Sequence, residues 1–235
     1  GVEPTAFDLQ AYQGQPYTRS FTISNTGGSP LEYQILEEAS APTASERVLL
    51  LSEDFENGFP ERWTVVTNGA PNVPWQLASD YGSPTAPNYA STGDAAMANS
   101  DLGQFLGGPS FDTEMWTPAM TYQDGFDLEY TMNFQAFFGD DFLDVDISTD
   151  GGTTWTQLIQ YTEDTCSETV SSCFTDLPAG TKEVLPLDAF VNEGDEVIVR
   201  WHFYTTEETS WEWWATVDDV AIVRNVEWLT TSPLA

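Results

Sequence analysis

The feature that most constrains this chain is a strict alternation of apolar and polar residues along several short segments. In residues 126–135 one set of alternate positions is apolar and the other is polar: Phe126, Leu128, Tyr130, Met132 and Phe134 against Asp127, Glu129, Thr131, Asn133 and Gln135. Successive side chains of a β-strand point to opposite faces, so this period of two predicts a strand with one buried face. The same pattern recurs in residues 143–147 and 197–203, and the sequence therefore predicts an all-β protein.

Several half-buried strands can cover their apolar faces by pairing two sheets over one core. This arrangement is a β-sandwich, and a chain of 235 residues is long enough to form it. Residues 17–23 also alternate, the turn Asn25-Thr26-Gly27-Gly28 follows them, and Leu31, Tyr33 and Ile35 continue the pattern, which predicts an N-terminal hairpin. Residues 37–46 carry no strand pattern and are predicted to be a linker. We therefore expect a short strand unit with its linker at residues 1–44 and a larger sandwich domain at residues 45–235.

The charge of the chain excludes some classes of partner. Asp and Glu number 38 against 6 Lys and Arg, and the formal net charge is -32. Phosphate groups are bound by clustered Lys and Arg, so we expect neither nucleic acid nor an anionic membrane surface as a partner. No apolar run approaches the roughly 20 residues of a membrane span, so membrane insertion is not expected. With 40% hydrophobic and 14% aromatic residues, the chain is predicted to fold despite its charge.

The two cysteines, Cys166 and Cys173, lie close together in a Ser- and Thr-rich stretch. Neither a second cysteine pair nor a nearby histidine completes a zinc site, so the spacing favours a local disulfide over two free thiols. A disulfide, the scarcity of lysine and the strong acidity together predict an extracellular or cell-surface location.

Catalysis is not expected. His202 is the only histidine, and its place in an alternating strand favours a structural role. No nucleophile, zinc-protease or phosphate-loop motif occurs. Residues 148–155 fit the Ser-x-Asp-x-Gly-x-Thr-Trp pattern of an Asp-box, in which Ser and Asp hydrogen-bond the turn of a hairpin remote from catalysis.

A series of short motifs occurs in order between residues 48 and 223. They include the opening Ser52-Glu53-Asp54-Phe55-Glu56-Asn57-Gly58, then Trp116-Thr117-Pro118, Val145-Asp146-Ile147-Ser148-Thr149 and the closing Val217-Asp218-Asp219-Val220. In this order the chain resembles the cleaved-adhesin domains of gingipains and the related choice-of-anchor and MAM-like domains. Residues 6–37 resemble the first strands of Ig-like domains that precede such domains in secreted bacterial proteins. The resemblance implies an all-β fold, namely a non-catalytic jelly-roll β-sandwich with a short N-terminal Ig-like β-hairpin unit.

The same resemblance implies structural calcium held by acidic residues near the first and last strands. The positions that match are Glu53, Glu56, Asp101, Asp218 and Asp219. Calcium prefers six to eight oxygen ligands, and carboxylates remote in sequence supply them once the chain has folded. The alternative for any one of these residues is a solvated surface carboxylate. Residues 67–72 stand where the family often has an Asp- and Gly-rich run, so the resemblance does not carry a metal site over to this segment.

An aromatic tract just before the last strand is the candidate ligand site. It consists of Trp211, Trp213 and Trp214. Exposed indole faces stack on sugars or fill protein hot spots, whereas the alternative is that at least two of these indoles belong to the core.

These observations predict a non-catalytic, calcium-stabilised binding or adhesion module of a secreted or surface protein, with a glycan or a protein as its ligand. The alternative is a structural subunit of an extracellular filament or surface layer. Such a subunit would assemble with neighbouring copies of itself through its N-terminal strands.

Overall fold

The computed structural model describes residues 2–3, 22–28, 46–68, 73–81, 87–99, 112–136, 141–206 and 213–226. The chain divides into two compact units, Gly1–Thr43 and Ala44–Ala235. In the first unit, strands β1 (Val2–Glu3) and β2 (Thr22–Ile23) pair antiparallel. The backbone N–H of Gly27 donates to Asn25 Oδ1 at 2.9 Å, which is an Asx turn. The remaining segments of the predicted hairpin, Leu31, Tyr33 and Ile35 among them, lie outside the described residues.

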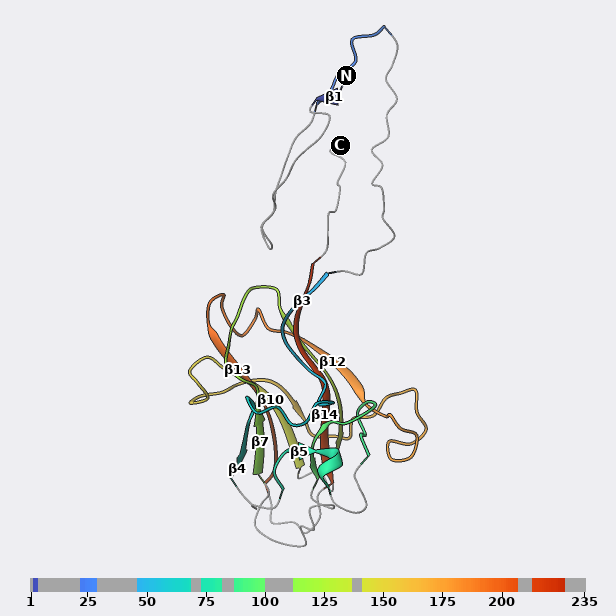
Figure 1. Cartoon of the computed structure of the whole chain (residues 1–235), viewed down its shortest axis with the longest axis vertical. Helices are drawn as coiled ribbons and strands as arrows, with labels where there is room; N and C mark the ends of the chain where they lie inside the picture. The colour runs from blue at the N-terminus through green and yellow to red at the C-terminus, as the bar shows by residue number, and fades with distance from the viewer. Residues whose placement is uncertain are drawn as a thin grey trace. The chain divides into compact units, whose positions relative to one another are not determined.

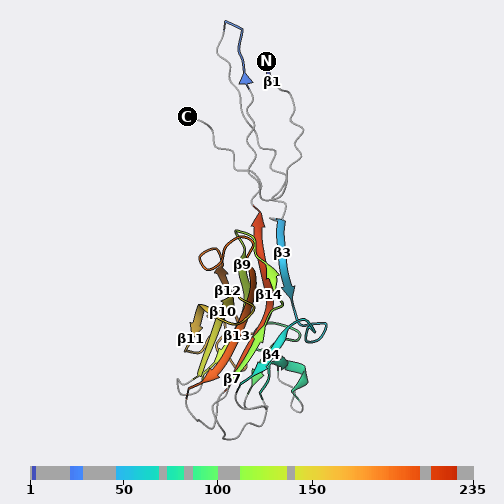
Figure 2. The ribbon, with the colours of Figure 1, turned by 90° about the vertical axis from the view of Figure 1, so that its left-hand side faces the viewer.

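The second unit is a sandwich of two antiparallel sheets (Figure 1 and Figure 2). The strands of one sheet follow the order β11-β10-β13-β7-β4, and β8 pairs with β13. Their bounds are β4 (Thr64–Thr67), β7 (Asp112–Trp116), β8 (Met120–Thr121), β10 (Asp141–Ser148), β11 (Thr156–Tyr161) and β13 (Glu196–Thr205). We call this sheet the β13 sheet.

The strands of the other sheet follow the order β12-β9-β14-β6-β5, and β3 pairs with β14. Their bounds are β3 (Glu46–Glu53), β5 (Gln76–Leu77), β6 (Ala96–Asn99), β9 (Asp127–Gln135), β12 (Thr181–Pro186) and β14 (Trp214–Val226). A single 3-10 turn, η1 (Ala78–Asp80), follows β5. We call this sheet the β14 sheet. The all-β sandwich predicted from the alternating segments is confirmed.

The core lies between the two sheets and is built from the predicted apolar faces. The alternating apolar side chains of β9, β10 and β13 are all buried: Leu128, Tyr130, Met132, Phe134, Leu143, Val145, Ile147, Val197, Val199, Trp201 and Phe203. Trp201 is central, because its ring stacks on Trp63 at 6.0 Å and meets the edge of Tyr130 at 5.5 Å. The period of two thus fixes which side of each strand faces the core, and leaves the opposite side of each sheet for other contacts.

A second, smaller group of aromatic residues covers part of the outer face of the β14 sheet. Trp214 is only 6% exposed, and its ring stacks on Tyr89 at 4.0 Å. Its Nε1 donates to Asn133 Oδ1 at 2.9 Å. Phe174 adds an edge contact to Trp214 at 5.6 Å. This cover is formed by loops, since Tyr89 and Phe174 lie outside the strands.

One of these loops is closed by the Cys166–Cys173 disulfide, as the spacing of the two cysteines favours. Phe174 follows the second cysteine directly, so the disulfide fixes the segment that carries this ring. The disulfide is consistent with an extracellular location. Among the described residues, no helix is long and apolar enough to cross a membrane.

Candidate functional site

The outer face of the β13 sheet carries a dense group of charged side chains on three neighbouring strands. The pairing register sets Asp144 of β10 and Glu114 of β7 on either side of His202 in β13. Two residues earlier in β13, Arg200 lies between Asp146 of β10 and Trp116 of β7. Side chains directly opposite each other on one face are about 5 Å apart at Cβ, so these groups interact. We call the group formed by Asp112, Glu114, Asp144, Asp146, Arg200 and His202 the carboxylate face.

Arg200 links two of the carboxylates. Its Nε donates to Asp146 Oδ2 at 2.8 Å and its Nη1 donates to Glu114 Oε2 at 2.9 Å. The guanidinium also lies over the Trp155 ring, 4.3 Å from the ring centroid. Burial raises the pKa of Asp146, and the bond to Arg200 partly offsets this rise. Glu114 accepts a further bond from Trp116 Nε1 at 2.7 Å, so it is held on several sides.

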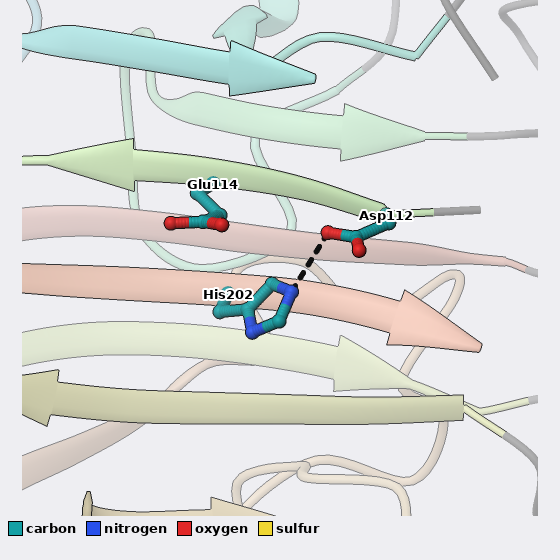
Figure 3. Close-up of side chains that lie close together, drawn as sticks. All are labelled: Asp112, Glu114 and His202. Carbon is teal, nitrogen blue, oxygen red and sulfur yellow. Dashed lines mark hydrogen bonds and ion pairs between the residues drawn. The ribbon is translucent and has the colours of Figure 1, made fainter. Parts of the chain in front are cut away.

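His202 occupies the centre of the carboxylate face. Its Nε2 lies 2.8 Å from Asp112 Oδ1, and Figure 3 shows this contact with Glu114 beside it. This contact orients the ring of His202. Two groups of side chains in the described residues bring potential metal-ligating atoms within 4.8 Å of one another: Asp112 with Glu114 and His202, and Asp144 with Asp146 and His202.

Aromatic rings and amides flank the carboxylate face. Tyr204 stacks on His202 at 4.5 Å and on Phe142 at 5.4 Å. The exposed Gln160 donates from Nε2 to Asp144 Oδ1 at 2.8 Å and to the Tyr204 hydroxyl at 3.3 Å. Burial and the nearby Asp144 raise the pKa of Tyr204 to about 12, so its hydroxyl remains protonated at neutral pH. The sheet thus presents stacked rings beside hydrogen-bonding groups.

The alternating pattern placed Asp144, Asp146, Arg200 and His202 on the polar sides of their strands, but it did not indicate that they meet. That meeting depends on which strands are neighbours and on their register, and neither is written in a single strand. Asp112 and Glu114 gave no signal of their own in the sequence.

Two of the residues predicted to hold calcium, Glu56 and Asp218, lie elsewhere, beside a loop at residues 87–95. Glu56 Oε1 accepts the backbone N–H of Asp94 at 2.9 Å. Asp218, in β14, accepts from Asn88 Nδ2 at 2.7 Å and from the Ser91 hydroxyl. Asn88 Nδ2 also donates to the Asp94 carbonyl at 3.0 Å. The loop therefore brings Glu56 and Asp218 against one short segment.

The other predicted calcium ligands are Glu53, Asp219 and Asp101. Glu53 pairs with Val220 at the end of β3, and its Oε1 accepts the Phe55 N–H at 2.9 Å. Asp219 is exposed and its N–H donates to Asp218 Oδ1 at 2.7 Å. Asp101 lies outside the described residues. Asp218 itself is 1% exposed, and this burial raises its pKa to about 6. Of the four predicted ligands that the structure describes, Asp218 is the buried one.

The predicted aromatic ligand site is only partly open. Trp214 is buried beneath Tyr89 and Phe174, so it belongs to the fold. Trp213 is half-buried and meets the exposed Phe174 at 4.9 Å. Trp211 lies outside the described residues. The open aromatic surface in this part of the structure is therefore the pair Trp213 and Phe174.

The Asp-box forms the hairpin that its sequence predicts. Asp150 Oδ1 accepts the Thr153 N–H at 3.0 Å and the Thr154 N–H at 2.8 Å, and the Ser148 hydroxyl donates to it at 2.8 Å. The Trp155 ring packs against Trp116 at 5.0 Å. The role of the Asp-box is to fix the turn between β10 and β11.

The order of the strands defines a two-sheet antiparallel β-sandwich. Among solved structures, the K1 cleaved adhesin domain of Lys-gingipain from Porphyromonas gingivalis W83 aligns with a TM-score of 0.52 and 21% identity, over 74% of this chain and 98% of that domain. The K3 cleaved adhesin domain of the same protein aligns with a TM-score of 0.50 and 22% identity, over 74% of this chain and 98% of that domain. No protein-family model and no curated protein sequence matches the chain. The resemblance in fold predicted from the ordered motifs is confirmed.

Proposed function

We propose that this protein is a non-catalytic extracellular binding module, stabilised by calcium, that recognises a glycan through the outer face of the β13 sheet. The observation that carries the proposal is the row of stacked rings of Phe142, Tyr204 and His202 beside the amide of Gln160 and the carboxylate of Asp144. Sugars present apolar C–H faces and dense hydroxyl groups. Aromatic rings contact the former, and carboxylates and amides hydrogen-bond the latter.

The charge of this face favours a neutral glycan. Among the described residues, the carboxylate face holds four carboxylates and one guanidinium, which bonds to two of them, so an acidic sugar would be repelled at short range. A neutral oligosaccharide meets no such repulsion, and ionised carboxylates form strong hydrogen bonds with its hydroxyls.

Calcium in this proposal stabilises the domain at the loop of residues 87–95. Glu56 and Asp218, with Glu53, Asp101 and Asp219 as further candidates, would hold the ion through oxygen atoms, the ligands that calcium prefers. One feature of the structure fits an ion-holding arrangement. A Cβ at Gly93 would overlap the Glu56 carboxylate, so the glycine permits the close approach of this group to the loop. The ion would neutralise carboxylates that otherwise repel each other.

Binding of oligosaccharides tests the proposed function. In calorimetric titrations we expect neutral oligosaccharides to bind and uronate-containing ones not to bind. Tyr204→Ala and Gln160→Ala should weaken binding at least ten-fold, because they remove a ring face and an amide donor from the same site. Circular dichroism would verify that both variants remain folded.

The matched control is Phe174→Ala, which removes an exposed ring from a loop that packs on Trp214 of the other sheet. It should leave the affinity unchanged. Loss of binding in Phe174→Ala with full binding in Tyr204→Ala would assign the ligand to the Trp213 and Phe174 pair instead. Failure of every neutral oligosaccharide to bind would contradict the glycan proposal.

A further inference from the structure

We propose that the carboxylate face contains a site for a divalent transition-metal ion of the zinc type, formed by Nδ1 of His202 and the carboxylates of Asp144 and Asp146. This site is separate from the calcium site at residues 87–95. It shares Asp144 and His202 with the proposed glycan surface, but the argument for it does not rest on glycan binding. Its three ligands lie on two neighbouring strands, β10 and β13.

The state of the His202 ring is the first argument. Nε2 lies 2.8 Å from Asp112 Oδ1, a carboxylate oxygen that can only accept. The proton of a neutral ring is therefore placed on Nε2, and Nδ1 carries the lone pair. A metal-ligating histidine characteristically donates its other N–H to a carboxylate, which fixes the tautomer and the ring orientation. Asp112 supplies this arrangement.

The second argument is that Nδ1 is buried and has no hydrogen-bond partner within the part of the chain that the structure describes. A buried acceptor without a partner is unfavourable, and a bound ligand would remove this cost. In Figure 3 this second ring nitrogen points away from Asp112. Since β13 lies between β7 and β10 in the sheet, the direction away from Asp112 of β7 is the side of β10.

Asp144 and Asp146 of β10 are the groups on that side. Their carboxylate oxygens and a nitrogen of His202 lie within 4.8 Å of one another. Arg200 contacts Asp146 through Oδ2, and the amides of Gln157 and Gln160 both contact Asp144 through Oδ1. Each of these hydrogen bonds engages one oxygen of its carboxylate, so none of them requires the second oxygen of the group.

The balance of charge is the third argument. The carboxylate face holds four carboxylates, and Asp144, Asp146 and Glu114 are each less than 10% exposed. Arg200 is the one cation that contacts them in the described residues, through Asp146 and Glu114. A buried excess of negative charge is costly unless a cation compensates it. A divalent ion between Asp144, Asp146 and His202 would remove most of this excess.

The ligand set selects the class of ion. Imidazole nitrogen with carboxylate oxygens suits zinc and its first-row neighbours, whereas calcium prefers oxygen alone. Three protein ligands also leave one position of a tetrahedral zinc site for water or a ligand oxygen. The two cysteines are joined in a disulfide and do not compete for the metal.

The single histidine makes the test direct. The whole protein would be labelled with 15N-histidine and titrated with zinc in an excess of calcium, which fills oxygen-only sites. We expect the one Nδ1 resonance to shift on zinc binding while Nε2 stays protonated. In calorimetry under the same conditions, His202→Gln should weaken zinc binding at least ten-fold. Asp112→Ala should weaken it by about 10–100-fold, the usual effect of losing the group that orients a metal-ligating histidine.

Glu193→Gln is the matched control, because it removes one negative charge from an exposed loop and should leave zinc affinity unchanged. Cobalt provides a second readout, since its visible absorption bands should appear with the unaltered protein and disappear with His202→Gln. An Nδ1 resonance that does not respond to zinc, or zinc binding that survives His202→Gln unchanged, would overturn the proposal. Neither result would bear on calcium or glycan binding, which are measured without zinc.

Discussion

Gly93 lies at the point where the loop of residues 87–95 meets Glu56. Its φ of +86° is favourable only for glycine, and a Cβ there would overlap Glu56 Oε1. We expect Gly93→Ala to displace the Glu56 carboxylate and to abolish the rise in melting temperature that calcium produces. The measurement is calorimetry of unfolding with calcium and with chelator. At a hundred-fold excess of free calcium over its Kd, the stabilisation lost would be about 2.7 kcal/mol.

Gly194→Ala separates this effect from backbone strain. Gly194 has a similar φ of +92°, but a Cβ there would meet nothing within 4 Å. Both variants should lose about 1 kcal/mol through the left-handed conformation. Only Gly93→Ala should lose the response to calcium. An equal response in the two variants, or an unaltered protein whose midpoint is the same with calcium and with chelator, would argue against calcium at this loop.

The stability that the Asp-box contributes depends on pH through Asp150. Hydrogen bonds from the Thr154 backbone and side chain and from Ser148 lower the pKa of Asp150 to about 2. A carboxyl whose folded pKa lies below its unfolded pKa near 4 contributes stability above pH 4 and loses it as the pH falls towards 2. We therefore expect Asp150→Asn to lower the urea midpoint at neutral pH, and the gap to the unaltered protein to narrow between about pH 4 and pH 2. A constant gap over this range would contradict the assignment.

Strands are the elements that the sequence predicted best, because the evidence for each is local. The alternation of residues 126–135, 143–147 and 197–203 fixed both the existence of β9, β10 and β13 and their buried faces. Their outer faces could not be interpreted in the same way. His202 is expected from the sequence to have a structural role, and the carboxylates that surround it lie 56 to 90 residues away in sequence. Such contacts depend on strand order and register.

The positions of the loops are the other part of the structure that the sequence did not predict. The sequence predicts Trp214 as part of a ligand site, but two loops cover its ring with Tyr89 and Phe174. Nothing in the periodicity of the last strand indicates this cover, because loops have no period. The same holds for residues 87–95, which position Glu56 and Asp218.

The Cys166–Cys173 disulfide holds in place the loop that carries Phe174, one of the two rings over Trp214. The two cysteines are seven residues apart, and closing so short a loop contributes about 2–3 kcal/mol by restricting the unfolded chain. We expect the double variant Cys166→Ser, Cys173→Ser to lose about this much free energy of unfolding in urea. The environment of Trp214 should change as well, because Phe174 follows the loop directly; near-ultraviolet circular dichroism would report this. An unchanged urea midpoint would show that the disulfide does not contribute to the free energy of unfolding.

On the scale of the whole molecule, the net charge of -32 is the dominant property. Charges of one sign repel both within a chain and between chains, and the range of this repulsion depends on salt. The Debye length is about 30 Å at 0.01 M ionic strength and about 3 Å at 1 M. Association between copies of this chain is therefore opposed at low salt and permitted when salt or calcium screens the charge.

This dependence provides a test of the alternative in which the protein assembles through its N-terminal strands. We expect the intact chain to be a monomer at low salt in light scattering. If the N-terminal strands mediate assembly, its mass should rise in 1 M salt or with calcium, while a chain beginning at Ser45 should remain a monomer. The shorter chain is a suitable control because the unit Ala44–Ala235 contains both sheets of the sandwich. Monomer masses for both chains in every condition would exclude assembly, and oligomers at low salt would contradict the argument from charge.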